Sequence, residues 1–423
     1  MTQYNAFYAQ SGGATAVINA SACGVIETAR RFKSKIGTVY AGRHGILGAL
    51  REDLIDTAAL SATLIHKLHQ TPGAAFGSCR YKLNDPQAQI AEYERILAVF
   101  QAHNIRYFFY NGGGDSQDTA HKLAIWSQQQ AYPLSCIGIP KTIDNDLPLT
   151  DNCPGFGSVA KYVAVSIQEA SLDVASMCNS STQVFILEVM GRHSGWIAAA
   201  GGLAARTESE GPQIILFPEV AFNPEAFLAR VSESVKKFGF CTIVASEGIR
   251  YQTGKFLADA GTQDAFGHKQ LGGVAPQLAQ LIKEKLGFKY HWAIADYLQR
   301  AAHHIASQVD VDQAYALGQA AVEFAVQGQN DVMPILIRQP TPDYQWTIAT
   351  AALSEVANQE KALPKAFISP DGFHITPACR AYLLPLIQGE AYPTYSQGLA
   401  DYFSCQLPSI PKKLPLPRAS RAW

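Results

Sequence analysis

The sequence predicts an α/β protein in which two doubly wound lobes, each built on a parallel sheet, are followed by a helical C-terminal extension. Short apolar runs rich in Val, Ile, Phe and Tyr alternate with longer segments of helical periodicity, which is typical of parallel sheets covered by helices on both faces. The chain has 423 residues, more than one compact core of ordinary size contains, so two lobes are expected. Glycine and polar residues gather where the predicted strands end, and ligands bind at that edge of open parallel sheets.

The individual elements follow from these patterns in chain order. Residues 5–9 read as a strand, a Ser-Gly-Gly loop follows, and a helix is expected from about residue 15 to residue 31. In the segment 88–103 the apolar residues recur at the spacing of one helix face. Further strands are expected at 36–41, 106–110, 136–139, 182–189, 213–217 and 242–246. A Gly-rich helix is expected at 194–205, and a helical segment outside the alternation from about residue 358.

Composition excludes several classes of protein. With 34 Lys and Arg residues against 35 Asp and Glu, the chain lacks the polybasic character that nucleic acids and anionic membranes attract. No stretch approaches the roughly 20 apolar residues of a membrane span, and the first residues lack the layout of a signal peptide. The eight cysteines show no C-x-x-C pair and no zinc-like spacing, so reduced thiols are expected. We therefore expect a cytoplasmic globular protein.

Two glycine turns between a strand and a helix are candidates for binding phosphate. Residues 112–116 read Gly-Gly-Gly-Asp-Ser, and residues 11–15 read Ser-Gly-Gly-Ala-Thr. Glycines let the backbone approach a ligand closely, and the first amides of the following helix are unpaired donors. Such turns are also common for purely structural reasons, so neither is specific alone. Neither matches the P-loop or the glycine fingerprint of dinucleotide binders, which argues against a nicotinamide dehydrogenase on the same type of sheet.

The loop at residues 140–146, Pro-Lys-Thr-Ile-Asp-Asn-Asp, carries a stronger signal. Two aspartates, a lysine, a hydroxyl and an amide follow directly after an apolar strand. Phosphoryl transfer needs a carboxylate to take the proton of the acceptor hydroxyl, oxygen ligands for magnesium, and a cation for the migrating charge. A solvated turn rich in Asp and Asn is the structural alternative.

This loop resembles the catalytic loop of the phosphofructokinases. Three further motifs follow in that family's order, namely Met-Gly-Arg at 190–192, Ser-Glu-Gly at 246–248 and Tyr-Leu-Gln-Arg at 297–300. The resemblance spans about residues 8–318. It implies the two-lobed phosphofructokinase fold and the transfer of a phosphoryl group to the 1-hydroxyl of fructose 6-phosphate.

The resemblance also implies a role for each matching position. Asp144 would be the general base that deprotonates the sugar hydroxyl, and Arg192 would bridge the sugar and the transferring phosphoryl group. Six residues would bind the sugar phosphate: Thr142, Met190, Gly191, Glu247, Tyr297 and Arg300. Tyr297 and Arg300 among them would grip the 6-phosphate. Donor binding would fall to Gly13, Arg80 and Gly114, and the ligands of Mg²⁺ would be Asp115 and Asp146.

Two positions favour pyrophosphate over ATP as the donor, so both are also assigned to the catalytic set. Asp115 stands where ATP-using members carry a small residue, so its carboxylate would occupy the space of the α-phosphate and repel its charge. Lys141 stands where those members carry glycine, and its ammonium would neutralise the charge that builds on the departing phosphate. The pair resembles the signature of the pyrophosphate-dependent members of the family.

Some features depart from the family or leave alternatives open. Gly114 stands where many members carry an aspartate that approaches magnesium, which makes the metal ligands the least secure assignment. An ATP-dependent phosphofructokinase and a non-catalytic subunit that binds sugar phosphate are the rival readings. We expect residues 1–150 to form the lobe that binds the donor, 151–345 the lobe that binds fructose 6-phosphate, and 346–423 the helical extension. Part of the second range could cross back to the first lobe. The family resemblance also favours a homodimer or homotetramer.

Overall fold

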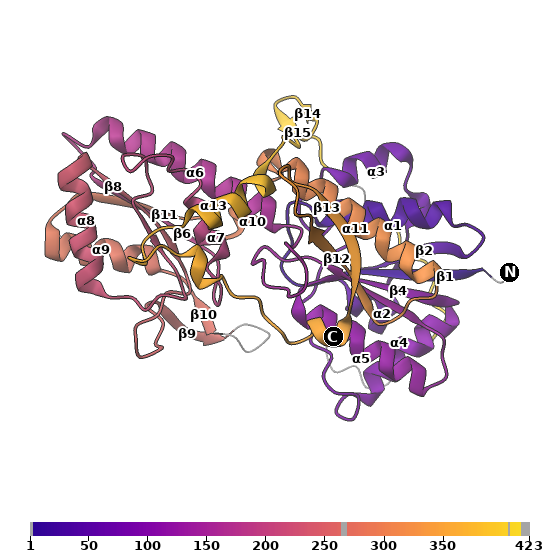
Figure 1. Cartoon of the computed structure of the whole chain (residues 1–423). Helices are drawn as coiled ribbons and strands as arrows, with labels where there is room; N and C mark the ends of the chain where they lie inside the picture. Colours follow the sequence, from indigo (N-terminus) through magenta and orange to yellow (C-terminus); the bar gives the residue numbers. More distant parts are fainter. Residues whose placement is uncertain (1–2, 264–268, 405–406, 416–423) are drawn as a thin grey trace.

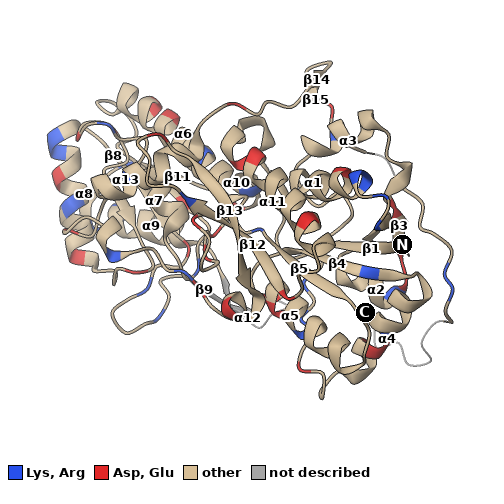
Figure 2. Ribbon diagram, turned by 45° about the vertical axis from the view of Figure 1, so that its right-hand side comes forward, with Lys and Arg blue, Asp and Glu red and all other residues tan. Residues whose placement is uncertain are grey.

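Two central sheets of seven and four strands organise the computed structural model, which describes residues 3–263, 269–404 and 407–415. Each sheet forms the centre of one lobe, and the two lobes lie side by side (Figure 1). Lys and Arg residues are interspersed with Asp and Glu residues along the ribbons of both lobes (Figure 2). None of the described helices is both long enough and apolar enough to cross a membrane.

The first sheet holds five parallel strands between two antiparallel edges. In spatial order its strands are β13 (Trp346–Ala352), β12 (Val332–Arg338), β5 (Ser135–Pro140), β4 (Ile105–Gly112), β1 (Tyr4–Gln10), β2 (Ile36–Gly42) and β3 (Leu54–Asp56). The covering helices are α1 (Ile18–Arg31), α2 (Ile46–Arg51), α3 (Ala62–His69), α4 (Ile90–Ala102), α5 (Gly114–Gln129), α11 (Gln308–Val326) and α12 (Leu353–Val356), with a 3₁₀ turn η1 at Thr57–Ala59.

Both faces of this sheet are buried, because successive apolar side chains of the central strands point to opposite faces. Phe7 and Phe108 pack under α2, α4 and α5, whereas their neighbours Tyr8 and Phe109 pack under α1, α3 and α11. Successive side chains of a strand point to opposite faces, so a strand that is apolar at every position must be covered twice. The predicted doubly wound lobe follows from this pattern.

The second sheet is smaller and wholly parallel. Its strands, in spatial order, are β11 (Tyr290–Ile294), β6 (Val184–Val189), β8 (Cys241–Ser246) and β7 (Ile214–Leu216). Its helices are α6 (Phe156–Met177), α7 (Trp196–Gly201), α8 (Pro224–Phe238), α9 (Val274–Leu286) and α10 (Asp296–Ala301), with a 3₁₀ turn η2 at His303–Ile305 and a hairpin of β9 (Asp259–Gln263) and β10 (Lys269–Leu271). Helices α6 and α7 contribute to the core on one face of the sheet, and α8 and α9 to the core on the other.

The chain returns to the first lobe after η2, because α11 packs against α1 and β12 and β13 extend the first sheet. Residues 346–352 therefore differ from the expected helical extension. They begin with aromatic and β-branched residues, which favour strands, and pair antiparallel with β12. The assignment of the donor and the sugar to separate lobes stays a prediction.

The remaining C-terminal segment lies across both lobes and mixes short elements (Figure 1). These are η3 (Lys365–Phe367), α13 (Pro377–Leu383), η4 (Leu384–Ile387), β14 (Tyr395–Ser396) and β15 (Leu399–Ala400). α13 and η4 contribute Leu383 and Leu386 to the core beneath α6 and α7. Ile410 hydrogen-bonds through its backbone N–H to the carbonyl of Leu54 in the first lobe.

Candidate active site

The predicted site residues lie at or just after the carboxyl ends of parallel strands from both sheets, except Arg80, which lies in the loop between α3 and α4. In the first lobe they follow β1, β4 and β5, and in the second lobe they follow β6, β8 and β11. Loops at this edge carry backbone and side-chain groups that the strands hold rigidly. The two sets of loops meet, because the Arg300 guanidinium lies against Gly13 and the carboxylate of Glu247 is close enough to raise the pKa of Asp144.

Lys141 is the central cation of the site. Its side chain is buried, with the residue 3% exposed, and its Nζ donates a hydrogen bond of 2.7 Å to the carbonyl oxygen of Gly13. Its backbone N–H donates to the carbonyl of Gly112 at 3.1 Å. Lys141 therefore ties the loop after β5 to both glycine turns predicted from the sequence.

The charge on Lys141 depends on its neighbours. Its pKa is lowered to about 8, mainly by burial and also by the cations of Arg300 and Arg80, while Asp144 and Asp146 act in the opposite direction. A lysine with this pKa is still mostly protonated at neutral pH. Three cations share one small region, which is the arrangement that binds a compact polyanion.

Asp144 has the properties of a general base. Its pKa is raised to about 7, mainly by burial and also by the nearby carboxylates of Asp146 and Glu247, while Lys141 and Arg192 act in the opposite direction. A base works best when its pKa lies close to the pH at which it operates. The environment of Asp144 provides that match.

The loop around Asp144 is held by hydrogen bonds on both sides. The hydroxyl oxygen of Thr142 accepts from the backbone N–H of Asp144 at 3.1 Å. Asn145 is fully buried and adopts a left-handed backbone conformation with φ of 53°, which asparagine tolerates better than most residues. Its Oδ1 accepts from the backbone N–H of Cys153 at 3.0 Å. The turn between the two aspartates is therefore defined by side-chain contacts as well as by the backbone.

Asp146 fits the role of a cation ligand. Its buried Oδ1 has no hydrogen-bond partner among the described residues, and burial raises the pKa of its carboxyl group. An unpartnered buried carboxylate oxygen is unfavourable unless a cation or proton accompanies it. The described residues contain no group of three or more Asp, Glu, His or Cys side chains arranged for a metal, so a cation here would keep ligands from water or substrate.

The second lobe contributes a tight turn and two charged side chains. Gly191 has φ of 128°, and a Cβ there would lie 2.6 Å from the carbonyl oxygen of Ser194, so only glycine fits. The hydroxyl of Ser246 donates to the Gly191 carbonyl at 2.5 Å, which joins the ends of β6 and β8. Burial raises the pKa of Glu247, and Arg192 opposes that rise. Arg192 and Glu247 thus lie together beside Asp144.

Arg300 lies in the same cluster, although it comes from the end of the second sheet. Its guanidinium stacks on the ring of Tyr297 at 3.8 Å, and Tyr297 itself is 59% exposed. A Cβ on Gly13 would lie 2.7 Å from an Arg300 nitrogen, so this arginine contacts the first glycine loop. Gln299 beside it is buried and accepts a hydrogen bond from the backbone N–H of Met190 at 3.3 Å. The binding of a sugar 6-phosphate by Tyr297 and Arg300 stays a prediction, and the structure adds the contact with the first loop.

Asp115 lies in the first turn of α5 and forms an ion pair with Lys82 at 3.1 Å. The two side chains are 35% and 44% exposed. A Cβ at Gly114 would have no neighbour within 4 Å, so the absence of a carboxylate there is not enforced by packing. The assignment of Asp115 as a metal ligand stays a prediction, and Lys82 already satisfies part of its charge.

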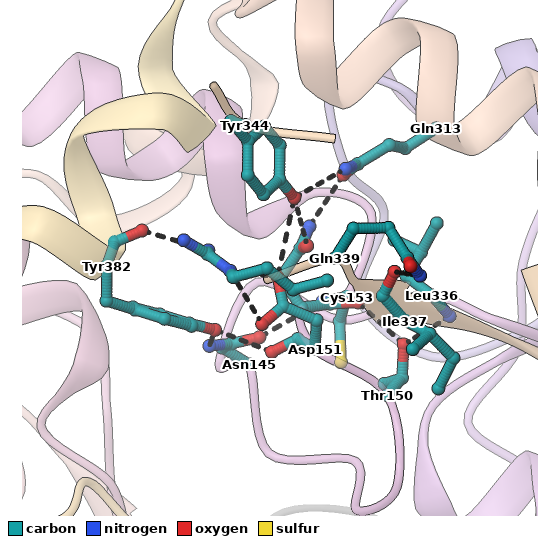
Figure 3. A network of polar contacts seen from close by, with 12 residues as sticks. Asn145, Thr150, Asp151, Cys153, Gln313, Leu336, Ile337, Gln339, Tyr344 and Tyr382 are labelled. Atoms are coloured by element: carbon teal, nitrogen blue, oxygen red, sulfur yellow. Dashed lines mark hydrogen bonds and ion pairs between the residues drawn. The ribbon is translucent and has the colours of Figure 1, made fainter. Parts of the chain in front are cut away.

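The sequence did not reveal several residues around this cluster. Lys82 is one charge in a polar segment, and only the structure shows that it forms an ion pair with Asp115. Lys361 donates its backbone N–H to the carbonyl of Asp146 at 2.6 Å, and Tyr382 contacts Asn145 (Figure 3). Both come from the C-terminal segment, more than 200 residues from the loop, where no local pattern could indicate them.

A sequence profile described as Phosphofructokinase matches residues 5–325, and the chain belongs to the phosphofructokinase family. The resemblance and the fold class predicted from the motifs are therefore confirmed.

Two similar proteins are both called pyrophosphate–fructose 6-phosphate 1-phosphotransferase. The protein of Methylococcus capsulatus is 61% identical over 98% of this chain and 99% of its own length. The protein of Halomonas elongata is 60% identical with the same coverage.

Solved structures give the same result. The pyrophosphate-dependent phosphofructokinase of Nitrosospira multiformis is 59% identical and superimposes with a TM-score of 0.91 over 97% of this chain and 99% of that one. The corresponding enzyme of Marinobacter aquaeolei is 57% identical with a TM-score of 0.90, over 97% of this chain and 98% of that one.

Proposed function

We propose that this protein transfers a phosphoryl group from pyrophosphate to the 1-hydroxyl of fructose 6-phosphate, giving fructose 1,6-bisphosphate and phosphate. The relatives that carry the name of this reaction align over nearly the whole chain at 60% and 61% identity. The observation that carries the proposal is the buried Lys141, which is held against the Gly13 carbonyl and shares its surroundings with Arg300 and Arg80. Such a compact cationic cluster suits a donor that is all phosphate.

Asp144 removes the proton from the 1-hydroxyl as that oxygen attacks the terminal phosphorus of the donor. The bridging P–O bond breaks, and its electron pair leaves with the second phosphate. The raised pKa of Asp144 lets it accept the proton near neutral pH and return it in the reverse direction. Because the reaction exchanges a phosphoanhydride for a phosphate ester, we expect it to be readily reversible.

Arg192 and Glu247 bind the acceptor side. Both lie beside Asp144, where a guanidinium can bridge the sugar and the phosphoryl group and a carboxylate can accept from sugar hydroxyls. The other proposed sugar ligands are Thr142, Met190, Gly191, Tyr297 and Arg300.

Asp115 and Lys141 set the choice of donor. The ion pair with Lys82 reduces the net charge of Asp115, so we infer that nucleotides are excluded by the volume of the Asp115–Lys82 pair as well as by repulsion. Lys141 stabilises the phosphate that leaves, because its ammonium is already fixed before the charge develops. Gly13, Gly114 and Arg80 complete the proposed donor site.

Mg²⁺ is the proposed cofactor, with Asp146 and Asp115 as its protein ligands. When bound, it would neutralise charge on the phosphate oxygens. We further propose a cytoplasmic homodimer or homotetramer. The seven cysteines that the structure describes are all free thiols, as a reducing compartment would keep them.

A coupled assay of the purified chain with fructose 6-phosphate tests the proposal. Pyrophosphate and magnesium should support turnover, and ATP should support at most a small fraction of that rate. Faster turnover with ATP would identify an ATP-dependent enzyme instead. No turnover with either donor would indicate a non-catalytic subunit.

A further inference from the structure

A tyrosine from the C-terminal segment contacts the loop that carries Asp144. The hydroxyl of Tyr382 in α13 accepts a hydrogen bond from Nδ2 of Asn145 at 3.1 Å and donates one to the backbone carbonyl of Asp151 at 2.6 Å (Figure 3). Asn145 directly follows Asp144, and Asp151 lies six positions after Asn145. One hydroxyl therefore connects the two ends of the segment 145–151.

The side chain of Asn145 depends on this contact. Its amide has two polar ends, and only Cys153 and Tyr382 are its hydrogen-bond partners among the described residues. The residue is fully buried and has a left-handed backbone, a conformation that costs less for asparagine than for most residues but is still held by its hydrogen-bond partners. Loss of either partner would leave a buried amide group unsatisfied, at a cost that relaxation of the turn could relieve.

The position of the Tyr382 ring is fixed independently of its hydroxyl. The ring packs against Trp196 at 5.2 Å and Phe367 at 5.5 Å between centroids. The guanidinium of Arg338 in β12 lies 4.6 Å from the centre of the ring and donates to the backbone carbonyl of Tyr382 at 3.0 Å. Phenylalanine could therefore occupy the same place without the hydroxyl.

The same arginine fixes the far end of the segment. Nε of Arg338 donates to both carboxylate oxygens of Asp151, at 3.0 and 3.1 Å. Lys361 adds two hydrogen bonds from its Nζ, to the carbonyls of Thr150 and Asp151, at 3.0 and 2.9 Å. The Asp151 end is thus secured several times, whereas Tyr382 is the only one of these residues that also reaches Asn145.

We propose that Tyr382 is a positioning residue of the phosphoryl-transfer reaction, which holds Asp144 in its reactive orientation by hydrogen-bonding the side chain of Asn145. The inference rests on the proposed function only for the identity of the reaction. A base must lie within hydrogen-bond reach of the hydroxyl it deprotonates, and a displacement of about 1 Å can cost up to about a hundredfold in rate. The bond to Asn145 resists such a displacement.

Tyr382→Phe tests the proposal, because it removes only the hydroxyl. We expect kcat to fall roughly ten- to a hundredfold while the KM values for both substrates change less than about twofold. Tyr315→Phe is the matched control, since Tyr315 is also partly buried and its hydroxyl bonds Glu27 at 2.8 Å on α1. An equal loss of kcat in both variants, or an unchanged kcat in Tyr382→Phe, would overturn the proposal.

A double-mutant cycle separates action through Asn145 from a general effect on folding. Asn145→Gly keeps the left-handed backbone and removes both side-chain hydrogen bonds. In that background Tyr382→Phe should lower kcat no further. If the two losses multiply instead, Tyr382 does not act through Asn145.

Amide hydrogen exchange gives a readout that does not depend on activity. In Tyr382→Phe the peptide covering residues 143–153 should exchange several-fold faster, because a hydrogen bond is worth about 1 kcal/mol. Peptides from α1 should not change. If the parent protein shows no turnover with pyrophosphate, the proposed function fails, and unchanged exchange at residues 143–153 would separately reject the contact with Tyr382.

Discussion

Replacement of Asp144 by asparagine should lower turnover strongly and make the folded protein more stable at alkaline pH. The burial and neighbouring carboxylates that raise the pKa of Asp144 to about 7 also make its ionised form costly in the folded state. A rise from 3.8 to about 7 corresponds to roughly 4 kcal/mol. The side chain is partly exposed and the new amide also needs hydrogen-bond partners, so we expect a net gain of about 1–2 kcal/mol.

The sign of the pH dependence follows from proton binding. Because the pKa of Asp144 is raised in the folded state, the folded protein holds more protons than the unfolded chain between about pH 4 and pH 7. Stability therefore falls as the pH rises through this window, and the full cost applies above it. Asp144→Asn should stabilise the protein more at pH 8 than at pH 5.

Thermal unfolding without substrates or magnesium measures this difference. We expect Asp144→Asn to raise the melting temperature by roughly 1–2 °C at pH 8 and by less at pH 5, with kcat lowered by roughly 10²- to 10⁴-fold. Asp151→Asn is the control, because its carboxylate accepts from Nε of Arg338 at 3.0 and 3.1 Å. That variant should lose stability at both pH values.

The reasoning would be refuted by an Asp144→Asn protein that melts no higher than the parent at pH 8. An equal gain at both pH values would also contradict it, since the stabilisation would then not come from the removal of the buried charge.

Three further predictions concern the donor site. Lys141→Ala should lower kcat with pyrophosphate at least tenfold, and adding Asp115→Gly should admit ATP. Initial rates with each donor measure both effects. Unchanged pyrophosphate turnover in Lys141→Ala would contradict the role of the ammonium. Lys82→Met should raise the KM for pyrophosphate roughly two- to fivefold because it leaves Asp115 unpaired, whereas Lys67→Met, which breaks a similarly exposed ion pair, should leave that KM unchanged. The pH profile of kcat/KM should rise through about 7 as Asp144 loses its proton and fall above about 8 as Lys141 does; an alkaline limb that persists in Lys141→Ala would show that another group titrates there.

Much of the fold could be predicted because its signals are local. The apolar runs located seven strands of the two sheets to within about two residues, for example residues 5–9 against Tyr4–Gln10, whereas β3, β11 and β12 were not predicted. Helix ends were less accurate, since the first helix begins at Ile18 and not near residue 15. The antiparallel strand β13 was assigned to the extension because its edge position is set by pairing with β12, and a sequence pattern does not show its partner.

The site could be predicted only as far as the loops that carry it. Spacing and chemistry identified the loop around Asp144, and the structure surrounds that residue with Lys141, Asp146, Arg192 and Glu247. The contact of Arg300 with the first glycine loop could not be foreseen, because it depends on how the two lobes pack.

The residues that hold the loop around Asp144 come late in the chain. The family profile ends at residue 325, whereas Arg338, Lys361 and Tyr382 all lie beyond it. During synthesis the loop leaves the ribosome long before these partners exist. The growing polypeptide can complete both sheets and still lack the contacts of Lys361 and Tyr382, so we expect full activity only when the chain as far as Tyr382 has emerged and docked.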